Sequence, residues 1–301
     1  MIYELIIIGA GPAGITAAIY AARKKLNFLV IAKEIGGQVI ENLVIENYTG
    51  YQEISGLELI SKFEEHLKEF KFDSISAEVI SVKKEHFFTV KTHEQSFQGR
   101  AVLICSGAVP KYLGVEGEIE YKNRGLSYCA TCDGPLFSGK KVAIVGGGNT
   151  ALTTVLQMDK IASKIVIIDK AKKLSADPVL IDKIMDSDKV KIYSNSKVKS
   201  IQGDKFVNQI QIDHDGKDVP INIEAIFINI GYKPAVKFIK DTVRLNSKDE
   251  IIVDTSNSTS IKGIFAAGDC TDIAYKQIIV AAGHGASAAL SANNYLLKTN
   301  G

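Results

Sequence analysis

The 301-residue sequence predicts an α/β fold built from two Rossmann-like dinucleotide-binding domains, the second inserted into the first. Two observations predict it. A strand, a glycine-rich turn and a helix follow one another twice, around residues 9–14 and 146–151. The segments that follow each copy also come in the same order. We expect the first domain to comprise residues 1–113 and 238–301, and the second to comprise residues 114–237.

The first copy begins with the apolar run YELIII, which predicts a strand that enters a glycine-rich turn at residues 9–14. An alanine-rich helical stretch continues to about Lys25, and a second strand follows at 27–31. The spacing G-x-G-x-x-G is typical of a phosphate-binding turn. Its glycines allow a tight turn and a close approach of backbone to pyrophosphate, and the helix N-terminus offers free N–H groups.

The second copy begins with KKVAIV at 140–145 and continues through GGGNTA into a helix that ends near Ala162 and a strand at 164–169. One glycine-rich turn alone could be an ordinary strand–helix connection. Two copies, each in the context of a βαβ unit, indicate two bound dinucleotides. The usual pairing is a flavin dinucleotide with a nicotinamide dinucleotide, because the flavin accepts hydride and passes electrons on.

The segments after the two turns correspond to each other. Alternating short strands are predicted at 72–92, and a buried strand at 100–110 ends in a glycine turn. Residues 189–217 and the buried strand at 225–234 occupy the same places after the second turn. A last strand within 261–272 places Asp269 at its end, and a helix over 277–297 closes the chain.

The composition excludes several classes of protein. With 36 basic and 34 acidic residues the net charge is +2, so no basic footprint of a nucleic-acid binder is present. The uncharged run at 5–22 could suggest a membrane span, but Glu4 precedes it and its glycines and proline fit a strand, turn and buried helix better. We therefore expect neither nucleic acid nor membrane as a partner.

Four cysteines, at 105, 129, 132 and 270, are too few for a disulfide framework in a chain of this length, which indicates a reducing, cytoplasmic compartment. Cys105 and Cys270 are expected to be buried free thiols. Cys129 and Cys132 form a C-x-x-C pair. Zinc needs four ligands, and neither a second C-x-x-C nor histidines at ligand spacing are present, so no metal site is predicted.

At these motifs the chain resembles the low-molecular-weight thioredoxin reductases and, more closely, the flavoprotein subunit of alkyl hydroperoxide reductase. The resemblance covers essentially all 301 residues. It rests on a series of long motifs in the same order: GAGPAG at 9–14, GGQV at 36–39, ENYTG at 46–50, CATCDGPLF at 129–137, GGGNTA at 146–151, GIFAAGDC at 263–270 and YKQIIVAAGHGASAALSA at 275–292.

The resemblance implies which residues hold the two nucleotides. Asp269 would bond the ribityl chain of FAD, although on its own an aspartate there could equally be a helix cap or turn residue. The implied FAD residues are Gly9, Gly11, Ala13, Gly14, Gly36, Gly37, Gln38, Asn47, Gly107, Gly268, Asp269 and Gln277. The implied nicotinamide-nucleotide residues are Gly146, Gly148, Asn149, Thr150 and Asp169.

The resemblance also implies that Cys129 and Cys132 form a redox-active disulfide. Electrons would pass from the nicotinamide to the flavin, to this disulfide, and then to a protein disulfide by thiol exchange. Cys132 would be the flavin-facing sulfur and Asp133 the proton donor and acceptor, although Asp133 could also be a turn residue. Family members are thought to be homodimers and to rotate one domain against the other, with hinges here near 111–115 and 234–240.

Two departures from the family refine the expectation. Thioredoxin reductases carry arginines after the second strand of the nucleotide domain, whereas this chain has Asp169 at the strand end. A carboxylate there accepts hydrogen bonds from a ribose 2′-OH and repels a 2′-phosphate, so we expect NADH rather than NADPH. The neighbouring Lys170, Lys172 and Lys173 could still attract a phosphate. The sequence also begins directly at the first strand, without the thioredoxin-like module of the alkyl hydroperoxide reductase flavoprotein.

We therefore expect a flavin-dependent protein-disulfide reductase that passes electrons to a separate thioredoxin-, glutaredoxin- or peroxiredoxin-type protein. Three alternatives remain open: the same scaffold driven by ferredoxin, a flavin reductase or ferredoxin–NADP reductase, and a non-catalytic dinucleotide sensor. The last two leave Cys129 and Cys132 without a role.

Overall fold

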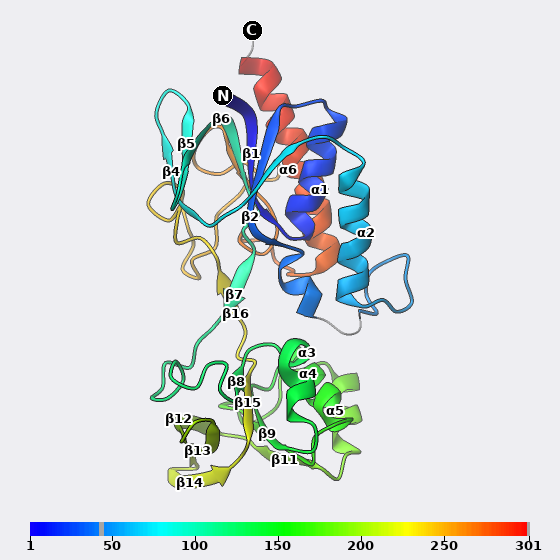
Figure 1. Cartoon of the computed structure of the whole chain (residues 1–301), viewed down its shortest axis with the longest axis vertical. Helices are drawn as coiled ribbons and strands as arrows, with labels where there is room; N and C mark the ends of the chain where they lie inside the picture. The colour runs from blue at the N-terminus through cyan, green and yellow to red at the C-terminus, as the bar shows by residue number, and fades with distance from the viewer. Residues whose placement is uncertain (42–44, 300–301) are drawn as a thin grey trace. The chain divides into compact units, whose positions relative to one another are not determined.

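The computed structural model describes residues 1–41 and 45–299, and the chain forms two compact units (Figure 1). Unit 1 contains Met1–Val109 and Lys233–Gly301, and unit 2 contains Pro110–Tyr232. The two crossing segments, β7 (Ala108–Pro110) and β16 (Tyr232–Pro234), pair with each other. The crossings lie a few residues before the domain boundaries predicted at 113 and 237.

Unit 1 is built on a seven-stranded sheet whose parallel part has the order β3-β2-β1-β6, with β17 also paired to β6 and the antiparallel strands β5 and β4 continuing from β6. The strands are β1 (Ile2–Ala10), β2 (Phe28–Ile35), β3 (Asp73–Ser76), β4 (Val79–Lys84), β5 (Phe88–Thr92), β6 (Ser96–Ile104) and β17 (Ile264–Ala266).

Three helices cover one face of this sheet (Figure 1): α1 (Pro12–Arg23), α2 (Gly56–Lys68) and α6 (Ile278–Thr299). Side chains alternate along a strand, so β1 serves two cores. Leu5 and Ile7 pack in the cluster that contains the helices, whereas Ile6 and Ile8 pack on the other face with residues of the segment after β16, such as Ile239. A short 3₁₀ helix, η1 (Gly37–Glu41), follows β2.

Unit 2 has a parallel five-stranded sheet in the order β11-β10-β9-β15-β8 and a separate antiparallel sheet in the order β12-β13-β14. The strands are β8 (Leu126–Ser127), β9 (Lys141–Val145), β10 (Lys164–Ile168), β11 (Val190–Tyr193), β12 (Ser196–Gly203), β13 (Val207–His214), β14 (Lys217–Asn222) and β15 (Ala225–Ile228). The helices are α3 (Ala130–Asp133), η2 (Gly134–Phe137), α4 (Asn149–Asp159) and α5 (Pro178–Met185).

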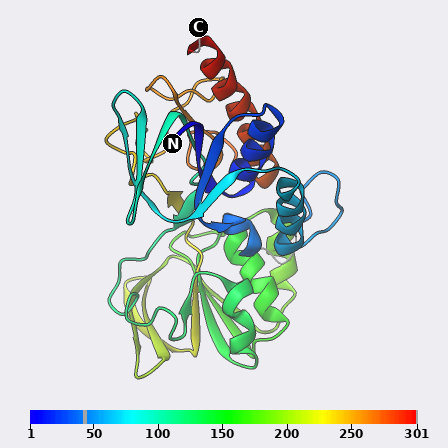
Figure 2. The same cartoon turned by 45° about the horizontal axis from the view of Figure 1, so that its top comes forward.

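The parallel sheet of unit 2 lies between a helical layer and the three-stranded sheet (Figure 2). Val142 and Ile144 of β9 pack with α4 and α5, whereas Ala143 and Val145 pack with the inner side chains of β12 and β13, such as Ile212. Both units thus have a parallel sheet in which a central strand leads through a glycine turn into a helix.

The uncharged run at 5–22 is divided between β1 and α1, as the sequence predicts. Among the residues that the structure describes, no helix has both the length and the apolar character needed to cross a bilayer.

Helices α1 and α6 approach each other at backbone distance. A Cβ atom added to Gly285 of α6 would lie 2.0 Å from the carbonyl oxygen of Ala13, in the first turn of α1. By contrast, a Cβ added to Gly283, two residues earlier in the same helix, would meet no atom within 4 Å. The two glycines therefore form a matched pair for a test of this contact.

We expect Gly285→Ala to lower the free energy of unfolding by about 1–3 kcal/mol, because the new methyl group forces the two helices apart. Gly283→Ala should raise it by about 0.5–1 kcal/mol, since alanine is the better helix former. Urea unfolding followed by circular dichroism measures both. Stabilisation by both substitutions would show that α6 does not depend on the close approach.

Candidate functional site

The first glycine turn brings the end of β1 against the end of β6. Gly9 has a φ of +104°, and a Cβ there would lie 2.2 Å from the carbonyl oxygen of Cys105. Gly11 caps α1, which begins at Pro12, and the nearest atom to a Cβ on Gly11 is 4.0 Å away. The turn therefore leaves room beside the free N–H groups of the helix N-terminus, which is the arrangement that binds a pyrophosphate.

Three of the predicted FAD residues act in packing. Ala13 is buried, and a Cβ on Gly14 would lie 1.9 Å from the carbonyl oxygen of Gly9. Gly268 has a φ of +78°, and a Cβ there would lie 3.1 Å from the Cβ of Ala13. These residues let α1 and the turn after β17 pack closely against β1, and so they fix the position of the turn.

The structure brings other predicted FAD residues together from distant parts of the chain. The Asn47 Nδ2 donates to the Gln277 Oε1 at 3.1 Å, although 230 residues separate them. The Gln38 Nε2 donates to the carbonyl oxygen of Ala108 at 2.5 Å. Gly37 has a φ of +56°, and a Cβ there would lie 3.7 Å from the Cα of Gly11, so the second predicted glycine pair faces the first turn.

Asp269 follows β17 and Ser106 follows β6, and the Ser106 Oγ has no hydrogen-bond partner of ordinary geometry among the described residues. Burial raises the pKa of the half-buried Asp269 above its ordinary value, and the charge of Lys276 opposes this effect. The Ser106 Oγ, directly before Gly107, is buried. Hydroxyl and amide groups of a bound dinucleotide would satisfy such atoms, so the residues present fit FAD.

The second glycine turn repeats the first. Gly146 has a φ of +130°, and a Cβ there would lie 2.2 Å from the carbonyl oxygen of Asn229. Gly148 caps α4, which begins at Asn149. A Cβ on Gly147 would lie 2.0 Å from the Asp169 Oδ2, so the carboxylate at the end of β10 lies directly against the turn. Asp169 is buried, with 8% of its surface exposed.

A hydrogen-bonded loop holds Asp169 in place. The Asp169 Oδ1 accepts from the N–H of Ala171 at 3.4 Å, and the N–H of Ser175 donates to the carbonyl oxygen of Gly147 at 2.8 Å. The Asn149 Nδ2 donates to the Asp177 Oδ2 at 2.9 Å, and the Asp177 N–H returns a bond to the Asn149 Oδ1 at 2.7 Å. The side chain of Asn149, a predicted nucleotide residue, is therefore occupied in fixing this loop, whereas Thr150 beside it is exposed.

Cys129 and Cys132 are joined by a disulfide, with their Cα atoms 5.4 Å apart, which confirms the predicted pair. Cys129 is half-buried and caps α3, and its Sγ accepts from the N–H of Cys132 at 3.1 Å. Cys132 is exposed. The buried Ser127 fixes the approach to the pair, because its Oγ accepts from the Cys129 N–H at 3.0 Å and donates to the Cys129 carbonyl at 3.2 Å.

The disulfide turn is anchored to α4. Ala130 is buried in the core that contains Leu152 and Met158, and a Cβ on Gly134 would lie 3.1 Å from the Met158 Sδ. Asp133 is the N-cap residue of η2, but its side chain makes no capping hydrogen bond. The Thr131 Oγ1, between the two cysteines, is buried without a hydrogen-bond partner among the described residues. The disulfide segment therefore packs against α4, the helix that follows the second glycine turn, and the two share one core.

Glu118 is a buried carboxylate that the sequence interpretation missed. Only 2% of its surface is exposed. Its oxygens accept from the N–H groups of Leu113 and Gly114 at 2.8 and 2.7 Å and from the Tyr128 hydroxyl at 2.8 Å. Burial and the Glu118 carboxylate raise the pKa of Tyr128 well above its ordinary value. Glu118 thus ties the first residues of unit 2 to the residue before Cys129.

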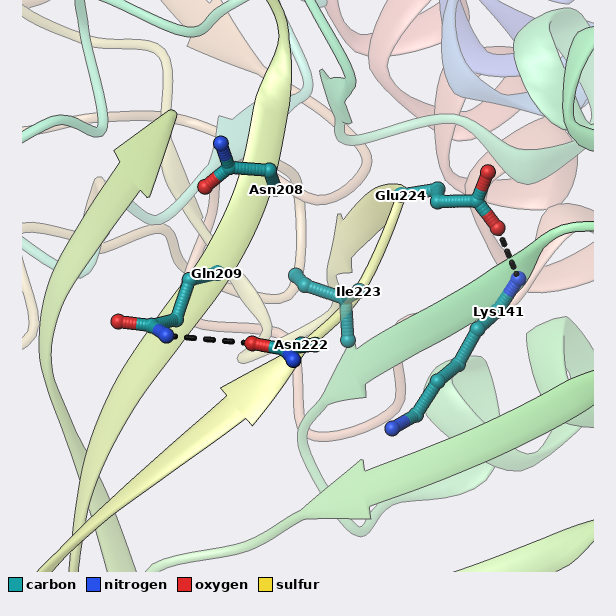
Figure 3. Close-up of a pocket in the computed structure, with 6 residues that line it drawn as sticks. All are labelled: Lys141, Asn208, Gln209, Asn222, Ile223 and Glu224. Carbon is teal, nitrogen blue, oxygen red and sulfur yellow. Dashed lines mark hydrogen bonds between the residues drawn. The ribbon is translucent and has the colours of Figure 1, made fainter. Parts of the chain in front are cut away.

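An open depression of about 560 Å³ lies elsewhere on unit 2 (Figure 3). Its polar groups bond mainly to one another: the Lys141 N–H donates to Glu224 at 3.1 Å, and Gln209 donates to Asn222 at 3.2 Å. No predicted site residue lines it. The lining residues are Lys141, Asn208, Gln209, Asn222, Ile223 and Glu224.

Comparison with known proteins identifies the family. A family model described as pyridine nucleotide-disulphide oxidoreductase matches residues 3–285. The chain belongs to this family. It is 37% identical over 300 residues to the NADH dehydrogenase of Bacillus subtilis, an alignment that covers 98% of this chain and 59% of that protein. It is 36% identical over 307 residues to the F subunit of alkyl hydroperoxide reductase of Pseudomonas aeruginosa, covering 99% of this chain and 59% of that one.

Among solved structures, the thioredoxin reductase of Lactococcus lactis matches with a TM-score of 0.94 at 32% identity, over 98% of this chain and 99% of that one. The resemblance inferred from the motifs and the fold of two Rossmann-like domains are thus both confirmed. The chain spans only 59% of the length of the two curated relatives named above.

The bonds of Glu118 should stabilise unit 2. Glu118→Ala leaves the N–H groups of Leu113 and Gly114 and the Tyr128 hydroxyl without their acceptor, so we expect a loss of about 1–3 kcal/mol in the free energy of unfolding. The exposed Glu116, two residues away, is the matched control, and Glu116→Ala should change stability by less than about 0.5 kcal/mol. Urea unfolding measures both, and equal effects of the two substitutions would contradict the assignment.

Proposed function

We propose that the chain is a flavin-dependent protein-disulfide reductase that takes electrons from a nicotinamide nucleotide. The observation that carries the proposal is the Cys129–Cys132 disulfide, of which Cys132 is an exposed residue, in the same unit as the second glycine turn. The family membership and the likeness to a thioredoxin reductase support it. A flavin reductase or a dinucleotide sensor would not need this disulfide.

FAD would be held by the first glycine turn, by Asp269 and by the hydrogen-bonded pair of Asn47 and Gln277. When bound, FAD supplies a hydride acceptor that can pass an electron pair on to a disulfide. The carboxylate of Asp269 would accept a hydrogen bond from a hydroxyl of the cofactor, which offsets the cost of its burial.

The chain's own chemistry is thiol–disulfide exchange. After two-electron reduction, one sulfur of the Cys129–Cys132 dithiol attacks a partner disulfide as a thiolate and forms a mixed disulfide, releasing one partner thiol. The second sulfur then attacks the mixed disulfide, which restores the Cys129–Cys132 bond and releases the other partner thiol. Asp133 is suited to exchange a proton with these sulfurs, because its carboxylate is free of capping bonds.

The proposed acceptor is a disulfide in a thioredoxin-, glutaredoxin- or peroxiredoxin-type protein. A thioredoxin reductase and an alkyl hydroperoxide reductase component are among the similar proteins, which supports this class of partner. A homodimer, a cytoplasmic location and rotation between the units stay predictions.

We further propose NADH as the preferred donor. Asp169 lies against Gly147 with its Oδ1 held by the Ala171 N–H, so a buried carboxyl group lies beside the turn. Lys170, Lys172 and Lys173 are exposed and make no ion pair with any other described residue. An exposed lysine has less influence on the choice between NADH and NADPH than a buried carboxylate that can accept a hydrogen bond from the ribose.

Anaerobic titration of the flavoprotein tests the role of the disulfide. The wild type should consume about four electrons per flavin, because the flavin and the disulfide each take two. Cys132→Ser should consume about two, keep its FAD and lose turnover of protein disulfides. Ser138→Ala is a control outside the pair and should still consume about four. A wild type that takes only two electrons would contradict the proposal.

Steady-state kinetics test the donor. We expect kcat/KM to favour NADH over NADPH by about 30–150-fold, which corresponds to about 2–3 kcal/mol. Asp169 would accept hydrogen bonds from the ribose hydroxyls of NADH and would repel the 2′-phosphate of NADPH. Asp169→Arg combined with Ala171→Arg should shrink or reverse this ratio, because a guanidinium pair grips a phosphate. If the wild type prefers NADPH, then Lys170, Lys172 and Lys173 determine the nucleotide specificity instead. Reduction by neither nucleotide would point to a donor such as ferredoxin.

A further inference from the structure

Asn229 lies at the carboxyl end of β15 and has an unsatisfied buried atom. Its backbone is fixed: the N–H donates to the Val145 carbonyl at 2.8 Å, and its own carbonyl oxygen lies against Gly146. Its side-chain Oδ1 is buried and has no hydrogen-bond partner in the described part of the chain. An amide oxygen removed from water without a donor is unfavourable, so the atom calls for a partner that the described residues do not supply.

The sheet order shows where Asn229 stands relative to the nucleotide-binding groups. In unit 2, β9 lies between β10 and β15. The chain passes from β9 through α4 to β10 on one side, whereas β15 and β8 lie on the other. The end of β9 is therefore the point at which the strand order changes direction, and ligands of such sheets bind across that point at the carboxyl ends of the strands.

Asp169, at the end of β10, and Asn229, at the end of β15, thus lie on opposite sides of the glycine turn that follows β9. If the pyrophosphate lies at the N-terminus of α4 and the adenosine ribose lies at Asp169, the other half of the dinucleotide extends over β15. The Asn229 Oδ1, which has no hydrogen-bond partner among the described residues, lies on that side.

We propose that the Asn229 Oδ1 accepts a hydrogen bond from the nicotinamide-riboside half of the nucleotide. The inference rests on the proposed function and adds a specificity-determining residue to it. Two groups in that half can donate, the carboxamide N–H₂ and the ribose hydroxyls. A neutral amide suits the position, since a carboxylate beside the pyrophosphate would repel it.

Equilibrium titration of the oxidised flavoprotein with NAD⁺, ADP-ribose and ADP separates the possibilities. ADP lacks both donor groups, ADP-ribose has the second ribose without the nicotinamide, and NAD⁺ has both. Asn229→Ala should weaken NAD⁺ binding by about 3–10-fold, the ordinary value of one neutral hydrogen bond, and leave ADP binding unchanged within about twofold. If the ribose is the donor, ADP-ribose binding weakens by the same factor, and if the carboxamide is the donor, it does not.

ADP binding by Asn229→Ala also shows that unit 2 of this variant is still folded. The exposed Asn208 provides a matched control, because Asn208→Ala should bind all three ligands as the wild type does. Unchanged NAD⁺ binding in Asn229→Ala would overturn the inference, and so would an equal loss of ADP binding. A wild type that binds none of the three would overturn the inference together with the proposed preference for NADH. The electron titration described above tests the disulfide-reductase function separately, so the two failures are distinguishable.

Discussion

The close approach of backbone to backbone at the two glycine turns is the constraint on which both units depend. A Cβ on Gly9 would lie 2.2 Å from the Cys105 carbonyl oxygen, and a Cβ on Gly146 would lie 2.2 Å from the Asn229 carbonyl oxygen. In each unit the first glycine of the turn therefore packs against the end of the strand beside it, β6 in unit 1 and β15 in unit 2. Only this contact lets the following helix begin directly above the strand ends, where a phosphate can reach its N–H groups.

Two of the three unsatisfied buried side-chain atoms of the described residues lie directly after these strand ends. The buried carboxylate of Glu118, which lies elsewhere, is bonded by two backbone N–H groups and the Tyr128 hydroxyl. At the ligand end of the sheets the pattern differs. Ser106 follows β6, Asn229 follows β15, and both have buried side-chain oxygens without partners, as does Thr131 within the disulfide turn. Native proteins rarely leave such atoms unpaired, so their position indicates binding or redox chemistry there.

The sequence predicts the parts of this arrangement that are local in the chain. The glycine spacing, the C-x-x-C pair and Asp169 each lie within a few residues, and all are identifiable as motifs. Contacts between residues that are distant in the chain cannot be identified from such motifs. Nothing in the residues around Asn47 indicates its bond to Gln277, and the bonds between Asn149 and Asp177 span a loop of irregular sequence. The roles of Glu118 and Asn229 cannot be predicted from the sequence for the same reason, because burial of a polar residue depends on which strands become neighbours.

The packing of the disulfide segment against α4 links the disulfide to the second glycine turn. The helix begins at the nucleotide turn, and Met158 in its last turn packs under Gly134 of the disulfide segment. Ala130 lies in the same core as the strand that carries the turn. Because the interior is close-packed, neither group can move far without the other. The second glycine turn and the disulfide therefore belong to one rigid body, and the residues proposed to bind FAD belong to the other unit. We infer that any motion that serves one of them displaces both, with the β7 and β16 segments as the covalent connections between the units.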